Sequence, residues 1–60
     1  MKHSDVNRLF TAAKRLNSAA NWLTGIKSED EDVKSRLNKF IDGITKIEKA
    51  IFKWYKEENE

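Results

Sequence analysis

The chain has 60 residues, a formal net charge of +2, no cysteine and no proline. It therefore forms neither disulfides nor thiolate metal sites, and no stretch approaches the roughly 18 apolar residues of a membrane span. Residues 1–5 lack the apolar core of a secretory signal, so we expect a soluble, cytoplasmic protein.

The first predicted element is a helix over residues 4–24. Its apolar residues recur at alternating steps of three and four, which keeps them on one narrow side of an α-helix. Ser4 is placed to cap its N-terminus. Gly25 follows the last periodic residue, where a helix often ends in the left-handed conformation that glycine tolerates. The apolar seam of this helix consists of Val6, Leu9, Ala13, Leu16, Ala20 and Leu23.

A short turn over residues 25–28 is expected next, then a second helix over residues 29–57 and an acidic tail at 58–60. The second helix has the same alternating spacing of apolar residues. Two such helices joined by a short turn predict an all-α fold, an antiparallel helical hairpin that forms a single domain over residues 1–60. The second seam consists of Val33, Leu37, Phe40, Ile44, Ile47, Ile51 and Trp54.

Acidic residues gather where the second helix is expected to begin. Ser28 and Glu31 match the Ser-x-x-Glu capping box. The run Glu29–Asp32 places carboxylates at the positive end of the helix dipole. Capping explains this run better than a cation site does, because the glycine and the ligand spacing of a calcium loop are missing.

A short turn also predicts the register of the two helices. Facing residues would have numbers that sum to about 52, which sets Ala13 opposite Phe40 and Leu16 opposite Leu37. Helix two would then extend past helix one by about nine residues, or roughly 13 Å. The residues expected to overhang are Ala50, Ile51, Phe52, Trp54 and Tyr55.

Helix one also has apolar residues beside its seam, which are Ala12, Ala19, Trp22 and Ile26. A 60-residue chain needs roughly 3,600 Å² of apolar burial to offset its conformational entropy, which two helices touching along one seam do not reach. The simplest partner is a second copy, turned end for end, so we predict a homodimer that forms a four-helix bundle. The alternatives are a higher oligomer or an obligate hetero-complex, and a marginally stable monomer. The predicted self-association residues are Ala12, Ala19, Trp22, Ile26, Ile51 and Trp54.

The pattern resembles the Rop family of plasmid-encoded RNA-binding proteins, which are helical hairpins of similar length that dimerise into four-helix bundles. The resemblance covers the overall length, the central acidic turn, and the alternation of alanine and leucine at Ala13–Leu16 and Ala20–Leu23. Helix two departs from it by using one phenylalanine and three isoleucines in its seam. The resemblance implies an architecture, and no functional residue is carried over.

Catalysis is not expected. His3 is the only histidine and lies near the N-terminus, and no serine has an evident base beside it. We therefore predict a non-enzymatic protein without catalytic residues, cofactor or metal site.

Two groups of residues are candidates for binding another macromolecule. Aromatic side chains are favoured at protein interfaces because they bury a large area with few rotors. The residues predicted to contact a protein target are Phe52, Lys53 and Tyr55. Lysines that recur every seven residues on helix two form a stripe that suits phosphates, although such a stripe is also typical of an ordinary solvated face. The candidate nucleic-acid-binding residues are Lys39, Lys46, Lys49, Lys53, Lys56, Arg8 and Arg15.

The function predicted from these patterns is that of a small regulatory or inhibitory binding protein that acts as a rigid helical dimer on a protein target. The alternatives are a nucleic-acid-binding regulator that uses the lysine stripe and a structural assembly element. Membrane attachment is disfavoured, because the acidic turn and the acidic tail would be repelled by an anionic lipid surface.

Overall fold

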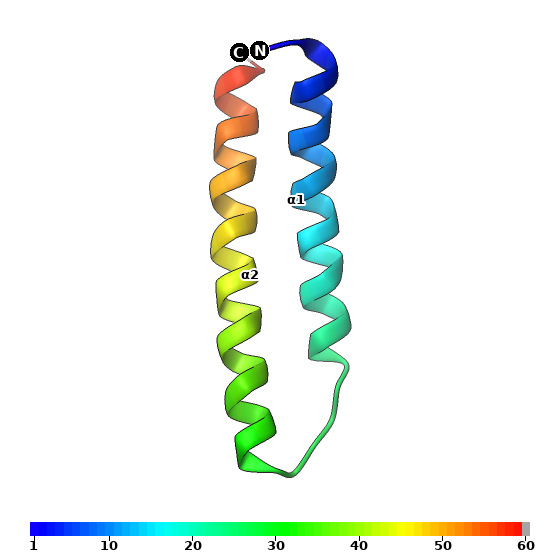
Figure 1. Ribbon diagram of the computed structural model, residues 1–60, viewed down its shortest axis with the longest axis vertical. Coiled ribbons are helices and arrows are strands. Elements are labelled where there is room, and N and C mark those ends of the chain that lie inside the picture. The colour runs from blue at the N-terminus through cyan, green and yellow to red at the C-terminus, as the bar shows by residue number, and fades with distance from the viewer. Residues whose placement is uncertain (60) are drawn as a thin grey trace.

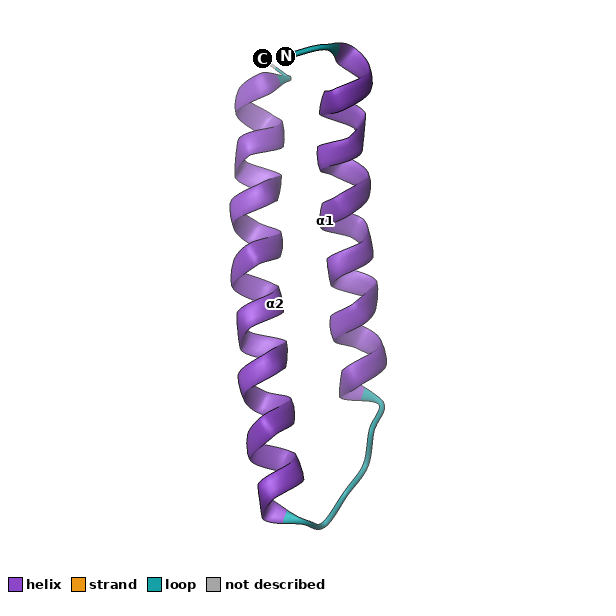
Figure 2. Ribbon diagram, viewed as in Figure 1, coloured by secondary structure: helices purple, strands orange, loops and turns teal. Residues whose placement is uncertain are grey.

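A computed structural model describes residues 1–59, which form two helices joined by one turn (Figures 1 and 2). Helix α1 spans His3–Thr24 and helix α2 spans Glu31–Glu58. They lie antiparallel and side by side, so that the two termini meet at one end of the hairpin and the turn forms the other. The predicted all-α hairpin is confirmed over this part of the chain. Neither helix contains a stretch, within these residues, that is long and apolar enough to cross a membrane.

The connection between the helices is longer than the sequence predicted. Helix α1 ends at Thr24 as expected, but the turn occupies residues 25–30 and α2 begins only at Glu31. Figure 1 shows the turn continuing past the end of α1 before it reaches the start of α2. The extra length of α2 therefore lies beside the turn.

The N-terminus of α2 is capped by Asp30. Its Oδ1 accepts hydrogen bonds from the backbone N–H groups of Asp32 at 2.8 Å and Val33 at 3.5 Å. The Ser28 hydroxyl, predicted to be the cap, instead accepts a hydrogen bond from the Asp30 N–H at 3.1 Å. The prediction of Ser28 was wrong because aspartate caps as well as serine does, and Asp30 is the residue within reach of the free amides.

Both predicted ends of α1 need a smaller correction. The helix begins at His3, one residue before the predicted cap Ser4, and no side chain caps it. Gly25 has φ −73° and ψ −15°, which is right-handed. Helix α1 thus ends without the left-handed residue that a glycine at this position predicts.

The longer turn changes the register of the helices. Asn17 Nδ2 donates to Glu48 Oε1 at 3.3 Å, and the rings of Phe10 and Tyr55 lie 5.2 Å apart between centroids. Facing residue numbers therefore sum to about 65 instead of about 52, a shift of roughly three to four helical turns along α2.

The predicted facing pairs and the predicted overhang are consequently wrong. Ala13 does not face Phe40, and residues 50–55 lie beside the middle of α1 rather than beyond it. The α-amino group of Met1 lies 3.6 Å from the carboxylate of Glu58, so the two helices end together.

The interior of the hairpin is narrow. Val6, Ala13 and Ala20 are buried, and they repeat every seven residues along α1, as the first seam predicts. Small side chains in this row let the two helices approach closely. No residue between Glu31 and Glu58 is buried to the same degree. The second seam is divided: Val33, Leu37, Ile44 and Ile51 are partly buried, whereas Phe40, Ile47 and Trp54 are exposed.

Candidate interaction surfaces

One side of the hairpin is closed by a cluster of aromatic rings. Phe10 of α1 contacts Phe52 and Tyr55 of α2, with ring centroids 6.3 Å and 5.2 Å apart, and the latter two rings lie 5.7 Å from each other. The ammonium groups of Lys14 and Lys56 lie 5.3 Å and 5.1 Å from the Phe10 and Phe52 centroids, within the range of cation–π attraction. We call this side, defined by these five residues, the aromatic face.

Two shallow hollows flank the ring of Phe52 on the aromatic face. One has a volume of about 350 Å³ and is lined by Phe52, Glu48 and the lysines Lys49, Lys53 and Lys56. The other, of about 440 Å³, lies between the helices and shares Phe52 and Glu48 with the first. The first hollow, which we call the lysine hollow, thus has an aromatic wall with three ammonium groups around it.

The opposite side of the hairpin carries large apolar side chains that the chain itself leaves uncovered. Phe40, Ile47 and Trp54 of α2 are 61%, 54% and 46% exposed. Their seven-residue spacing sets them on one row. This row lies away from the aromatic face, because Ile47 and Phe52 are separated by about 140° around α2.

Helix α1 supplies the other half of this uncovered surface. Leu9, Leu16 and Leu23 are partly buried and repeat every seven residues on the side of the buried alanines that is remote from Phe10. In the observed register, Leu16 and Ile47 lie within about two residues, or roughly 3 Å, of one level along the helices. We call the combined surface the apolar face; its members are Leu9, Leu16, Leu23, Phe40, Ile47 and Trp54.

The outer edge of the apolar face along α2 is a second row with seven-residue spacing. From the turn towards the C-terminus it reads Arg36, Gly43, Ala50 and Glu57. A Cβ atom added to Gly43 would have no neighbour within 4 Å, so α1 does not require a glycine at this position. We call this row the edge row.

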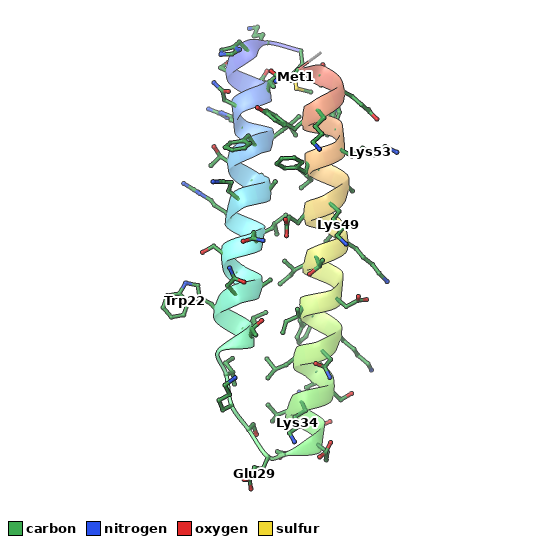
Figure 3. All side chains as sticks on the ribbon, turned by 180° about the vertical axis from the view of Figure 1, so that it is seen from behind. Met1, Trp22, Glu29, Lys34, Lys49 and Lys53 are labelled. Carbon is green, nitrogen blue, oxygen red and sulfur yellow. The ribbon has the colours of Figure 1, made fainter. Side chains whose placement is uncertain are left out.

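The residues predicted to mediate self-association are only partly brought together. Trp22 is 80% exposed and points away from α2 (Figure 3). Ile26 lies in the turn and lines an open hollow of about 610 Å³ between the end of α1 and the start of α2. The remaining four lie on or next to the apolar face: Ala12, Ala19, Ile51 and Trp54.

The lysine stripe lies on the outer edge of α2, opposite the hairpin interior. Lys39, Lys46 and Lys53 are exposed, and Figure 3 shows Lys53 pointing away from α1. The Nζ of Lys46 lies 3.0 Å from an Asp42 carboxylate oxygen, so the middle of the stripe is partly neutralised.

The two arginines that were grouped with this stripe lie elsewhere. Arg8 and Arg15 share a row with Trp22 at seven-residue spacing, and Trp22 points to the outside of α1. The arginines and the lysine stripe therefore occupy opposite edges of the hairpin and do not form one continuous basic surface.

Two of the three residues predicted to contact a protein target pack against the hairpin itself. Phe52 and Tyr55 are partly buried against Phe10, while Lys53 stays exposed beside the lysine hollow. Sequence reasoning missed Phe10, because it lies outside the heptad seam and only the true register brings it to Tyr55.

No group of three or more His, Asp or Glu side chains within residues 1–59 is arranged to hold a metal ion. The chain matches no protein-family model, and no curated protein or solved structure is significantly similar to it.

Proposed function

We propose that this chain is a small, non-enzymatic regulatory or inhibitory binding protein that works as a dimer. The apolar face is covered by a second copy, and the aromatic face remains free to bind an acidic segment of a protein target. The observation that carries the proposal is the exposed row of Phe40, Ile47 and Trp54, because soluble monomers rarely leave a contiguous row of large apolar side chains in water.

The amount of exposed surface supports the dimer. The hairpin has 5013 Å² of accessible surface. A compact monomer of its mass, 7.0 kDa, exposes about 4,000 Å² on the usual scaling of area with mass. The excess is close to the roughly 800 Å² that each partner buries in an interface of standard size.

The lysine hollow supports an acidic protein segment as the target. The ammonium groups of Lys49, Lys53 and Lys56 line one hollow and suit the carboxylates of such a segment. None of these three lysines has an ion-pair partner among residues 1–59.

The same geometry favours protein over nucleic acid. Single strands bind largely by stacking bases on open aromatic rings. Here Lys56 already lies over the ring of Phe52, and Phe10 and Tyr55 contact that ring from the side. Arginine, which recognises phosphate in a bidentate manner, does not line the hollow.

Binding of labelled peptides tests the proposal. A short peptide with glutamates around a central leucine should bind, and the same peptide with glutamines should not. Lys49→Glu should abolish that binding, whereas Lys39→Glu, which makes the same change outside the lysine hollow, should weaken it little. Equal binding by wild type and Lys49→Glu would contradict the proposal.

An oligonucleotide of matched charge serves as the third ligand. Nucleic-acid binding has a log–log salt slope of about −0.9 per phosphate contact. Tighter binding of the oligonucleotide than of the peptide, with a salt slope that corresponds to several phosphate contacts, would overturn the protein-target proposal in favour of the nucleic-acid alternative.

A further inference from the structure

We infer that the second copy docks on the apolar face end for end, with α2 packed antiparallel against α2 of the second copy. This inference rests on the proposed dimer and specifies which helices meet and in which direction. It is carried by the spacing of the apolar face and by the charges of the edge row.

The apolar face is nearly symmetric about its own centre. Leu16 and Ile47 lie within roughly 3 Å of one level, and each is the middle member of a row of three with seven-residue spacing. A two-fold axis perpendicular to the helices at this level exchanges the two ends of each row. Phe40 then meets Trp54 of the second copy, Ile47 meets its own counterpart, and the outer leucines exchange in the same way.

The edge row has opposite charges at its two ends and small residues between them. Antiparallel pairing sets Arg36 opposite Glu57 of the second copy, twice in the dimer, and sets Gly43 opposite Ala50. The Nε of Arg36 lies 3.2 Å from an Asp32 carboxylate oxygen, which leaves the other guanidinium N–H groups free for a second carboxylate. The charges of the row are therefore complementary to those of its own reversed copy.

The other two-fold arrangement brings mixed charges together. An axis parallel to the helices would pack α1 against α2 of the second copy at equal levels. Glu57 of the second copy would then lie near both Asp5 and Arg8 of α1, so that attraction and repulsion offset each other, whereas the edge row pairs opposite charges at both of its ends.

The open space around Gly43 agrees with a close approach of the second copy. Glycine within a helix costs about 1 kcal/mol relative to alanine, and nothing in the hairpin approaches the position. A second α2 crossing at the small residues Gly43 and Ala50 would come close to the backbone there, which gives the glycine a role that α1 does not.

Cysteine cross-linking tests the geometry directly, because the natural chain contains no cysteine. Under mild oxidation, Ile47→Cys should form a disulfide-linked dimer with itself, since the residue lies at the two-fold axis. A mixture of Gly43→Cys and Ala50→Cys should form a mixed disulfide. The matched control Lys39→Cys, on the outer edge of α2, should remain unlinked.

The outcomes separate the geometry from the dimer itself. If the protein sediments as a dimer but Ile47→Cys stays unlinked, while a mixture of Leu16→Cys and Ile47→Cys becomes linked, the axis is parallel to the helices and the inference is wrong although the dimer stands. If the protein sediments as a monomer at every concentration, both the inference and the proposed dimer are overturned.

Charge reversal on the edge row gives an independent readout. Arg36→Glu and Glu57→Arg should each raise the dimer dissociation constant by roughly five- to tenfold, and the double variant should restore it towards the wild-type value. Lys34→Glu, which reverses another exposed charge near the start of α2, is the control and should change it little. Failure of the double variant to recover affinity would overturn the antiparallel pairing.

Discussion

The aromatic face and the apolar face of this hairpin both contain aromatic side chains, but the two sets differ in burial. On the aromatic face, Phe10, Phe52 and Tyr55 contact one another and are partly buried. On the apolar face, Phe40 and Trp54 belong to the exposed side chains. The chain thus covers one set of its aromatic rings with its own residues and leaves the other in water.

The difference shows where each face obtains its stability. Rings that contact across the two helices stabilise the hairpin within a single copy. Exposed apolar side chains stabilise nothing until another surface covers them. Substitutions on the two faces should therefore affect different quantities, namely the folding of the hairpin on one face and association on the other.

A lysine at the centre of the apolar face should have the strongest effect. Ile47→Lys would bring two ammonium groups to the two-fold axis in an apolar environment, and we expect the dimer dissociation constant to rise by at least about 100-fold. Sedimentation equilibrium over a dilution series measures it. Asn38→Lys places the same side chain on the other side of α2 and should leave association unchanged; equal loss in both variants would refute the assignment of the face.

Removal of a ring from the aromatic face should lower folding stability instead. Phe10→Ala should reduce the free energy of unfolding by about 2 kcal/mol, less than for a fully buried phenylalanine, because the ring is only partly covered. Urea unfolding at a fixed protein concentration gives this value. In the Phe10→Ala background, Phe52→Ala should cost less than it does alone, and strict additivity would show that the two rings do not interact.

The start of α2 offers a test at the turn, remote from both faces. Asp30→Ala removes the N-cap and should cost about 1 kcal/mol, while Asp30→Asn should retain most of the stability. Thermal unfolding distinguishes the two. Ser28→Ala should cost less than Asp30→Ala; the reverse order would restore Ser28 as the cap.

The smallest change acts on the edge row. Gly43→Ala should raise helix content in dilute protein by stabilising α2, by up to about 1 kcal/mol, because nothing in the hairpin obstructs the added methyl group. At the same time it should weaken the dimer severalfold if a second α2 comes close there. Circular dichroism and sedimentation of the same samples give both quantities. A variant that gains helix without any loss of association would argue against close approach at Gly43.

Local signals in the sequence predicted what depends on local structure. The seven-residue repeat of Val6, Ala13 and Ala20 correctly gave the buried row of α1, and the end of α1 at Thr24 was also correct. These features follow from helical periodicity within one segment and do not depend on the partner helix.

The register was missed because it depends on tertiary contacts. Both Ser28 and Asp30 are good N-caps, and a choice between them changes the turn by two residues. The contact that fixes the true register involves Phe10, which lies outside the heptad seam and so carried no weight in the pattern. The periodicity within one helix identifies a row of apolar residues, but it does not identify the surface against which that row packs.

The candidate surfaces were predicted in part for the same reason. Heptad spacing identified Trp54 and Ile51 as residues for association, and both lie on the side of α2 that carries the apolar face. It also grouped Arg8 and Arg15 with the lysines of α2, although their seven-residue spacing with Trp22 puts them on the outer side of α1. Whether charged residues on two helices form one surface depends on the register and on which sides of the helices face each other, and the sequence pattern gave neither.

Sedimentation equilibrium of the unmodified chain shows whether a second copy covers the apolar face. We expect the protein to sediment at twice its chain mass of 7.0 kDa at micromolar concentrations, and its unfolding midpoint to fall on dilution, because association and stability are linked. A chain that sediments at its own mass throughout the dilution series, with a sharp melting transition independent of concentration, would contradict this expectation.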